Sequence, residues 1–331
     1  MSPGSHEGSE GSVSNLHKRL SDETSLAGGW ITALDLELLH HFTTSTCYTL
    51  SSNQMIRDFW RVDLPQMGFS HHYLLRGILS LAALHLSCSR VSQRDVLVER
   101  ALVHHNASLS VAMPMIAAIG PYMPLPLIQF SILTSYIAFA TPKQPHNLLI
   151  VSDGVTPDWL LLFRGVRNFI EHDGGALQAS SLDMMHRSGI LMSAEWNACV
   201  DAEHDAIDEL DDRIRSYFPD KRKADILLGG TDALKRSFKL FRDKAGDDDS
   251  RVRCLTMWIF KIDEDFVGLL RSNDYGALCV LGFFCVLLAR LDHKWWIRGC
   301  GVHLIQRIYS TLDAGHRLWI RWPIEEIGWA P

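Results

Sequence analysis

The spacing of apolar residues predicts helices along most of the chain. In residues 71–86, HHYLLRGILSLAALHL, apolar side chains fill two adjacent stripes at helical spacing. A face of that width exceeds what a surface helix needs, so this helix is expected to pack on more than one side. No stretch shows the strict apolar–polar alternation of a half-buried strand. The predicted fold class is all-α.

One helix has a clear start and stop signal. Thr156, Pro157 and Asp158 offer an N-cap, a first-turn proline and an acid at the positive end of the helix dipole. The apolar-periodic run WLLLFRGVRNFIEH follows, and Gly174-Gly175 can end it. We predict a helix from residue 158 to about 172.

Two uninterrupted apolar stretches raise the question of a membrane. Residues 125–140 would be about 24 Å long as a helix, and residues 275–289 are shorter. A bilayer requires roughly 20 residues, so we predict both to be central helices of a core, with no membrane partner.

Residues 176–250 differ from the rest in their charge. Residues 201–212, DAEHDAIDELDD, hold seven acids in twelve positions, and KRK at 221–223 and GDDD at 246–249 follow. Acids at i,i+4 spacing repel on a helix, so this segment is expected to be a solvated arm or a partly mobile insertion.

We predict a disordered Ser- and Gly-rich leader over 1–29. A single large multi-helix domain over 30–331 would carry the polar insertion between apolar halves at 30–175 and 251–331.

Composition narrows the class of protein. With 331 residues, 47% of them hydrophobic, the chain can bury a core without a metal or cross-link. Its 32 basic residues face 38 acidic ones, without a basic stripe, so direct DNA binding by this chain alone is not expected. The seven cysteines form no C-x-x-C pair and mostly lie in apolar runs, which predicts buried free thiols in a reducing compartment.

Two patterns suggest a metal site. His-His pairs occur at 40–41, 71–72 and 104–105. Neighbours on a helix point about 100° apart, so a pair cannot clamp one ion, and we expect one inward ring bonded to backbone and one surface ring. Residues 208–212 resemble the magnesium-binding D-[DE]-x-x-D of all-α terpene cyclases, but Asn273-Asp274 lacks the hydroxyl and acid of the companion motif. We predict no metal and no cofactor.

Common catalytic signatures are also missing from the sequence. It contains no G-x-S-x-G, no P-loop and no G-x-G-x-x-G. No catalytic residue is predicted.

Tryptophan crowds the C-terminal end. Five of the ten tryptophans lie in the last 37 residues, at Trp295, Trp296, Trp319, Trp322 and Trp329. They either cap the end of the helical core or, opened by Gly299 and Gly301, form an aromatic wall of a pocket for a flat apolar ligand.

Several long segments resemble a known family. LDLELLHHFTTSTCYTLS (34–51), FSHHYLLRGILSLAALHLS (69–87), DWLLLFRGVRNFI (158–170) and residues 283–329 occur in the order and spacing of one domain. That domain is the C-terminal regulatory domain of fungal Zn2Cys6 transcription factors, in the branch of the sterol uptake control proteins. The resemblance runs from about Trp30 to the C-terminus.

The resemblance implies an all-α, ligand-sensing module in the nucleus, with the cytoplasm as the other location considered. Its apolar pocket would accept a small hydrophobic ligand, a sterol or an isoprenoid, and it would act through protein partners or a homodimer. The residues it brings near the ligand or the dimer contact are Trp295, Trp296, Gly299, Gly301 and His303.

The sequence departs from the family at two places. Cys300-Gly301 stands where the family often has Trp-Gly or Trp-Ser, so a bulky ring is missing from the predicted site. The two C-x-x-C-x₆-C halves of the zinc cluster do not occur before Trp30. An isolated sensor domain, a gene model that lost an exon and a fold reused for another task all fit this observation.

Three functional hypotheses follow. The leading one is a transcription-regulator-like protein that senses a small apolar ligand. The alternative is a biosynthetic enzyme that cyclises or rearranges a hydrophobic intermediate, with His303, His293 or Asp292 as acid–base groups. The third is a dimerisation or inhibitory partner of full-length relatives.

Overall fold

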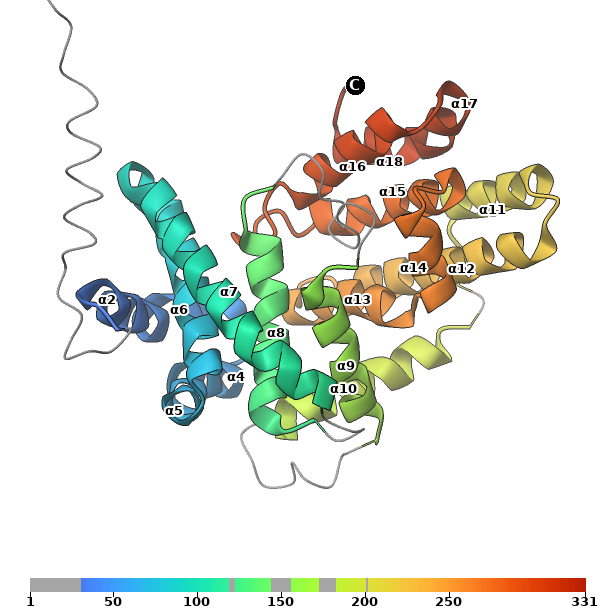
Figure 1. Ribbon diagram of the computed structural model, residues 1–331. Helices are drawn as coiled ribbons and strands as arrows, with labels where there is room; N and C mark the ends of the chain where they lie inside the picture. The colour runs from blue at the N-terminus through green and yellow to red at the C-terminus, as the bar shows by residue number, and fades with distance from the viewer. Residues whose placement is uncertain (1–30, 119–122, 144–155, 173–182, 201) are drawn as a thin grey trace, which may run out of the picture.

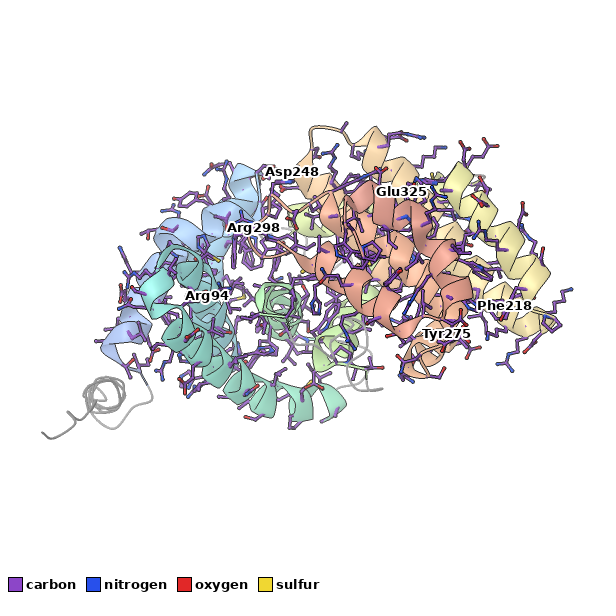
Figure 2. All side chains as sticks on the ribbon, turned by 90° about the horizontal axis from the view of Figure 1, so that it is seen from above. Arg94, Phe218, Asp248, Tyr275, Arg298 and Glu325 are labelled. Carbon is purple, nitrogen blue, oxygen red and sulfur yellow. The ribbon has the colours of Figure 1, made fainter. Side chains whose placement is uncertain are left out.

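The computed structural model describes residues 31–118, 123–143, 156–172, 183–200 and 202–331, and these residues form helices and no strand. The all-α prediction is confirmed. Two groups of helices lie on either side of a central pair, α8 and α9 (Figures 1 and 2). The predicted leader at 1–29 and the Gly174-Gly175 stop lie outside the described residues.

The N-terminal group is built around one buried helix. Its members are α2 (Ala33–His41), α3 (Cys47–Leu50), α4 (Gln54–Asp58), α5 (Leu64–Ser70), α6 (His72–Ser89) and α7 (Arg94–Ala118). π-Helical turns at Phe42–Thr46 and Phe59–Asp63 continue α2 and α4, and a 3₁₀ turn at Val91–Gln93 precedes α7. Helix α6 packs on α2, α5, α7 and α8, and most of its residues are buried, as its wide apolar face predicted.

The central pair joins the two groups. Helix α8 (Leu125–Ala140) has the bounds of the first apolar stretch, and it packs on α6 and on α9 (Asp158–His172). Helix α9 begins at the predicted residue, with Asp158 in its first turn. The central position of α8 lets it offer side chains to both groups of helices (Figure 1).

The C-terminal group surrounds a second apolar helix. Its members are α10 (Asp183–Ala198), α11 (Asp205–Tyr217), α12 (Lys221–Asp243), α13 (Asp248–Lys261), α14 (Glu264–Arg271), α15 (Tyr275–Ala289), α16 (Cys300–Thr311), α17 (Ala314–Arg317), a 3₁₀ turn at Leu318–Ile320 and α18 (Arg321–Ile327). Helix α15 again has the predicted bounds, is buried from Gly276 to Leu288, and packs on α12, α16 and α18.

No single helix in the described part of the chain is long and apolar enough to cross a membrane. Helices α14 and α15 meet the length and composition criteria only as a pair, and they are bent by 105° relative to each other.

The expectation of a solvated arm is wrong for α11 and α12. Ile207, Leu210 and Ile214 are buried on one face of α11. The carboxylate of Asp211, also buried, accepts a hydrogen bond of 2.6 Å from Lys235 Nζ on α12. Asp205, Glu209 and Asp212 are exposed away from this face, and the apolar residues recur at i, i+3 and i+7. Counting charges alone missed this amphipathic pattern.

A buried ion pair fastens α2 to α7. Asp35 is 1% exposed, and its carboxylate contacts the His104 ring at 2.8 Å and the Arg100 guanidinium. The inward ring of this His-His pair thus bonds a carboxylate, where a backbone partner was expected. Burial alone would raise the pKa of Asp35, but hydrogen bonds from His104 and Arg100 and from the Thr32 backbone hold it well below its ordinary value of 3.8.

All seven cysteines are free, and six of them are buried, with Cys88 exposed. Burial raises the pKa of Cys254 to about 12, which keeps it a thiol at neutral pH. The prediction of buried free thiols is confirmed for all but Cys88.

Candidate ligand-binding site

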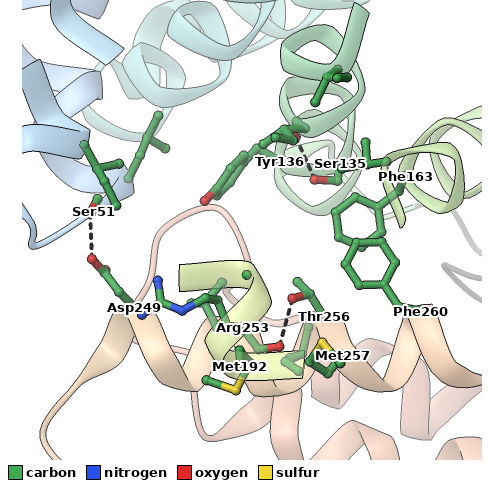
Figure 3. Close-up of a pocket in the computed structure, with 18 of the residues that line it drawn as sticks. Ser51, Ser135, Tyr136, Phe163, Met192, Asp249, Arg253, Thr256, Met257 and Phe260 are labelled. Carbon is green, nitrogen blue, oxygen red and sulfur yellow. Dashed lines mark hydrogen bonds between the residues drawn. The ribbon is translucent and has the colours of Figure 1, made fainter. Parts of the chain in front are cut away.

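A mostly apolar cavity of about 220 Å³ lies among α8, α9, α10, α13 and residues 50–60 (Figure 3). Its apolar lining consists of Leu50, Ile56, Trp60, Leu125, Ile128, Ile132, Tyr136, Phe139, Phe163, Val166, Met192, Val252, Leu255, Met257, Phe260 and Trp296. The volume is below the roughly 300–1,000 Å³ of pockets that hold drug-sized ligands. In this conformation the cavity suits a small molecule.

Three aromatic contacts shape the walls of the cavity. Tyr136 meets Trp296 edge to face, with ring centroids 4.8 Å apart, and meets Trp60 in the same way at 6.0 Å. Phe163 and Phe260 stack at 4.3 Å across α9 and α13. Rings in these arrangements form rigid apolar surfaces. Tyr136 on α8 thus contacts a ring from each of the two outer groups of helices.

Three buried polar atoms at the cavity have no protein partner. Gln129 is 2% exposed and its Oε1 accepts no hydrogen bond, and the indole Nε1 of Trp296 donates none. The Nε of Arg253 is also buried without an acceptor. The Tyr136 hydroxyl extends toward the side where Asp249 and Arg253 lie (Figure 3). Buried polar groups without partners are rare in proteins, so a ligand or a water molecule is expected to satisfy these three.

Tyr136 remains a hydrogen-bond donor at neutral pH. Burial raises the pKa of its hydroxyl well above the ordinary value, and the Asp249 carboxylate adds to the effect. Gln129 Oε1 supplies an acceptor and Trp296 Nε1 a donor. The cavity therefore offers both kinds of hydrogen bond to a molecule that is otherwise apolar.

Asp249 closes the cavity on the side of α3 and α4. Its carboxylate accepts hydrogen bonds from the Ser51 hydroxyl at 2.6 Å and from the Ser52 amide at 3.0 Å. Arg253, one turn further along α13, donates to the Ser250 hydroxyl at 2.9 Å. The acid is thus occupied in holding residues 51–53 on α13.

The structure separates the two adjacent tryptophans. Trp296 lines the cavity, whereas Trp295 lies against the His85 ring at 4.6 Å. The Trp295 indole Nε1 donates to Thr49 Oγ1 at 2.8 Å. Trp295 therefore fastens the loop after α15 to the N-terminal group without reaching the cavity.

Gly299, Gly301 and His303 also lie outside the cavity lining. Gly299 has a φ of +74° and its amide donates to the Asp292 carboxylate at 2.6 Å. A Cβ on Gly301 would lie 2.7 Å from the carbonyl oxygen of Cys285, so this glycine permits close packing of α16 on α15. His303 is half-buried in the first turn of α16. Of the five predicted residues, Trp296 is the one at the cavity.

The groups of the enzyme hypothesis do not meet at the cavity. His293 lies 2.8 Å from the Asp248 carboxylate, and Asp292 accepts from the Gly299 amide. Neither these residues nor His303 is among those that line it. The geometry gives that hypothesis no acid–base pair at the site.

Sequence reasoning missed Gln129, Tyr136 and Arg253. The first two lie in the apolar run of α8, where their polar atoms were a signal: they are seven residues apart and share one face of the helix. Arg253 had no such local signal, because its neighbours in the cavity come from distant segments.

An all-α module that encloses an apolar cavity with a few polar groups is the class that the fold and site define. No family model matches the chain. A Zn(2)-C6 fungal-type transcription factor of Gibberella zeae is 26% identical over 322 residues, which cover 88% of this chain and 61% of that protein. The factor afumD of Aspergillus fumigatus is 30% identical over 140 residues, covering 40% of this chain and 35% of that protein. Sterol uptake control protein 2 of Candida albicans is 23% identical over 299 residues, covering 80% and 38%.

The chain is therefore a homologue of the fungal Zn(2)-C6 transcription factors, sterol uptake control protein 2 among them, and the resemblance inferred from its motifs is confirmed. It spans less than two thirds of the length of each of these relatives.

Proposed function

We propose that this chain is a regulatory domain of a nuclear transcription regulator and that it binds a small apolar ligand in the cavity around Tyr136. The homology to transcription factors supports the regulatory role. The single observation that supports ligand binding is the cavity itself, which is mostly apolar and contains three buried polar atoms without partners.

The proposed mechanism is a population shift. Trp60 belongs to the N-terminal group, Tyr136 to the central pair and Trp296 to the loop after α15, so a ligand touching all three favours one packing of these parts. The output is a change in contacts with protein partners or with a second copy of the chain.

The polar groups define the ligand chemistry. A ligand hydroxyl can donate to Gln129 Oε1 or accept from the Tyr136 hydroxyl or Trp296 Nε1, so an apolar alcohol matches the site. The name of sterol uptake control protein 2 supports a sterol. The cavity volume of about 220 Å³ favours a shorter isoprenoid alcohol, because a sterol requires the walls to move apart.

A cavity-filling variant tests this proposal. Ser193 on α10 lines the cavity, and Ser193→Leu would fill part of it with apolar atoms. We expect wild-type protein to be stabilised by geraniol, farnesol or ergosterol by about 2.7 kcal/mol at 100 times the Kd. Ser193→Leu should lose this stabilisation while its ligand-free stability stays equal or rises.

The matched control is Ser110→Leu, because Ser110 is exposed on α7. It should leave ligand stabilisation unchanged. Unchanged ligand stabilisation in Ser193→Leu, or none by any of the three alcohols in the wild type, would contradict the proposal.

A further inference from the structure

A second hollow, of about 430 Å³, opens between the end of α12, the start of α13, the end of α15 and residues 203–204. Its charged lining consists of the cations Lys239, Arg242, Arg251 and Arg290 and the acid Glu203. We call it the cationic pocket. The concentration is local, since the chain as a whole has a formal charge of −6.

Two of these cations have no acidic partner in the described part of the chain. Arg251 forms no ion pair, and its Nε is buried without a hydrogen-bond acceptor. Lys239 also forms none. By contrast, Arg290 pairs with Glu326 at 2.6 Å, and Arg242 is 4.0 Å from Asp243. A buried guanidinium N–H without an acceptor costs free energy, so an acceptor supplied by a ligand would stabilise the protein.

The acids nearest in sequence to Arg251 are held by other partners. Asp247 accepts from the Ser250 hydroxyl at 2.5 Å, and Asp248 from Lys294 at 2.9 Å. Asp249 is bonded to residues 51–53 on the far side of α13. The positive charge of the pocket therefore stays uncompensated from within α13.

The rest of the lining is aromatic. Phe238 and Phe241 lie under the cations, with the Arg251 guanidinium 5.0 Å above the Phe241 ring. The His204 ring is 4.8 Å from Phe238, and its Nδ1 is buried without a partner. Burial lowers the pKa of His204, and Arg290 adds to this, so the neutral ring has one more hydrogen bond to offer at pH 7.

We propose that the cationic pocket binds a small phosphate ester. Arginine matches the oxygens of a phosphoryl group with two parallel N–H donors, and lysine adds a point charge. Arg251 and Lys239 would hold the phosphoryl oxygens, and Phe238 and Phe241 would contact the organic part. The site is separate from the apolar cavity, and nothing in the ligand proposal for that cavity depends on it.

Calorimetric titration of the full chain tests the proposal. We expect phenyl phosphate to bind and Arg251→Gln to weaken the binding by about tenfold or more, because a charge-assisted hydrogen bond is lost. Arg242→Gln should also weaken it. Arg242 is 72% exposed, so this second variant is expected to fold even if Arg251→Gln does not.

The matched control is Arg222→Gln, at the opposite end of α12 and 81% exposed, which should bind as the wild type does. Titration with inorganic phosphate distinguishes an ester ligand from free phosphate. If inorganic phosphate binds more weakly than phenyl phosphate, the pocket is assigned to an ester. Equal binding of the two probes assigns it to free phosphate and overturns the role of the phenylalanines. Absence of binding by both probes at about 10 mM, or equal binding by the wild type and both pocket variants, would overturn the proposal.

Discussion

The apolar cavity and the cationic pocket lie on opposite sides of one helix. Arg253 of α13 lines the cavity and Arg251 lines the pocket. Residues two apart on a helix point about 200° apart, so a single turn of α13 serves both hollows. In the cavity, two of the three unsatisfied atoms, Gln129 Oε1 and Trp296 Nε1, are neutral, and the third is Arg253 Nε. In the pocket, four cations dominate the lining, and Arg251 Nε and the neutral His204 Nδ1 have no partner. Each hollow has unpartnered polar atoms, and the surrounding lining, mostly apolar in the cavity and mostly cationic and aromatic in the pocket, distinguishes the two ligand chemistries.

The largest effect is expected at the cavity wall. Trp296→Ala removes a buried ring that packs on Tyr136 and Phe139, and it should lower the free energy of unfolding by about 3–5 kcal/mol. Chemical denaturation measures it. Trp295→Ala is the control and should cost less, because Trp295 is half-buried. Equal losses of unfolding free energy in the two variants would contradict the larger contribution of Trp296 to the core.

Asp35 is a buried charge whose carboxylate is bonded to Arg100 and His104, in contrast to Arg251, whose Nε has no acceptor. Asp35→Asn leaves Arg100 and His104 without a carboxylate and should cost about 3 kcal/mol at pH 7. The folded-state pKa of Asp35 lies below its ordinary value of 3.8, so its contribution is present above that pH and is lost as the pH falls further. Denaturation of wild type and variant between pH 7 and pH 2 should show converging stabilities. A constant difference would contradict the depressed pKa.

Substitutions at two glycines beside the predicted site measure the cost of close packing and the cost of backbone strain separately. Gly301→Ala forces a Cβ within 2.7 Å of the Cys285 carbonyl oxygen and should cost about 1–3 kcal/mol. Gly299→Ala meets no atom within 4 Å and costs about 1–2 kcal/mol, through its positive φ alone. Thermal unfolding of both variants and of Gly299→Asn, which tolerates the left-handed region, measures the difference. Equal stability of wild type and Gly301→Ala would contradict the close packing of α15 and α16.

The smallest change in stability is expected from a substitution in the cationic pocket. Arg251→Met keeps much of the side-chain contact with Phe241 and removes an unpartnered charge, so without phosphate it should leave stability unchanged or raise it by up to about 1 kcal/mol. Denaturation in phosphate-free buffer measures this. A clear loss of stability would show that Arg251 already has a structural partner.

The sequence predicts the helices better than it predicts the cavity. The bounds of α8 and α15 follow from uninterrupted apolar runs ended by Thr141 and Arg290, and the start of α9 follows from its capping residues. The π-helical turns at Phe42–Thr46 and Phe59–Asp63 leave no mark in the apolar spacing, because the apolar positions continue through them.

The sequence predicts only part of the cavity lining, and the reason is physical. Trp296 stood out because tryptophans cluster near it, but the groups that it faces come from α8, α10 and α13, far away along the chain. Whether Gln129 has a hydrogen-bond partner depends on the packing of those helices, and no local pattern records that. The amphipathic face of α11 was readable from Ile207, Leu210 and Ile214, and was hidden only by the number of acids around it.

The most direct test of ligand binding compares the two adjacent tryptophans in one spectrum. The full chain labelled with 5-fluorotryptophan, with signals assigned through Trp295→Phe and Trp296→Phe, is titrated with farnesol and followed by fluorine NMR. We predict a saturable shift of the Trp296 signal, with the Trp295 signal unchanged. A Trp296 signal that stays in place at farnesol concentrations that stabilise the protein, while Trp295 shifts, would contradict it.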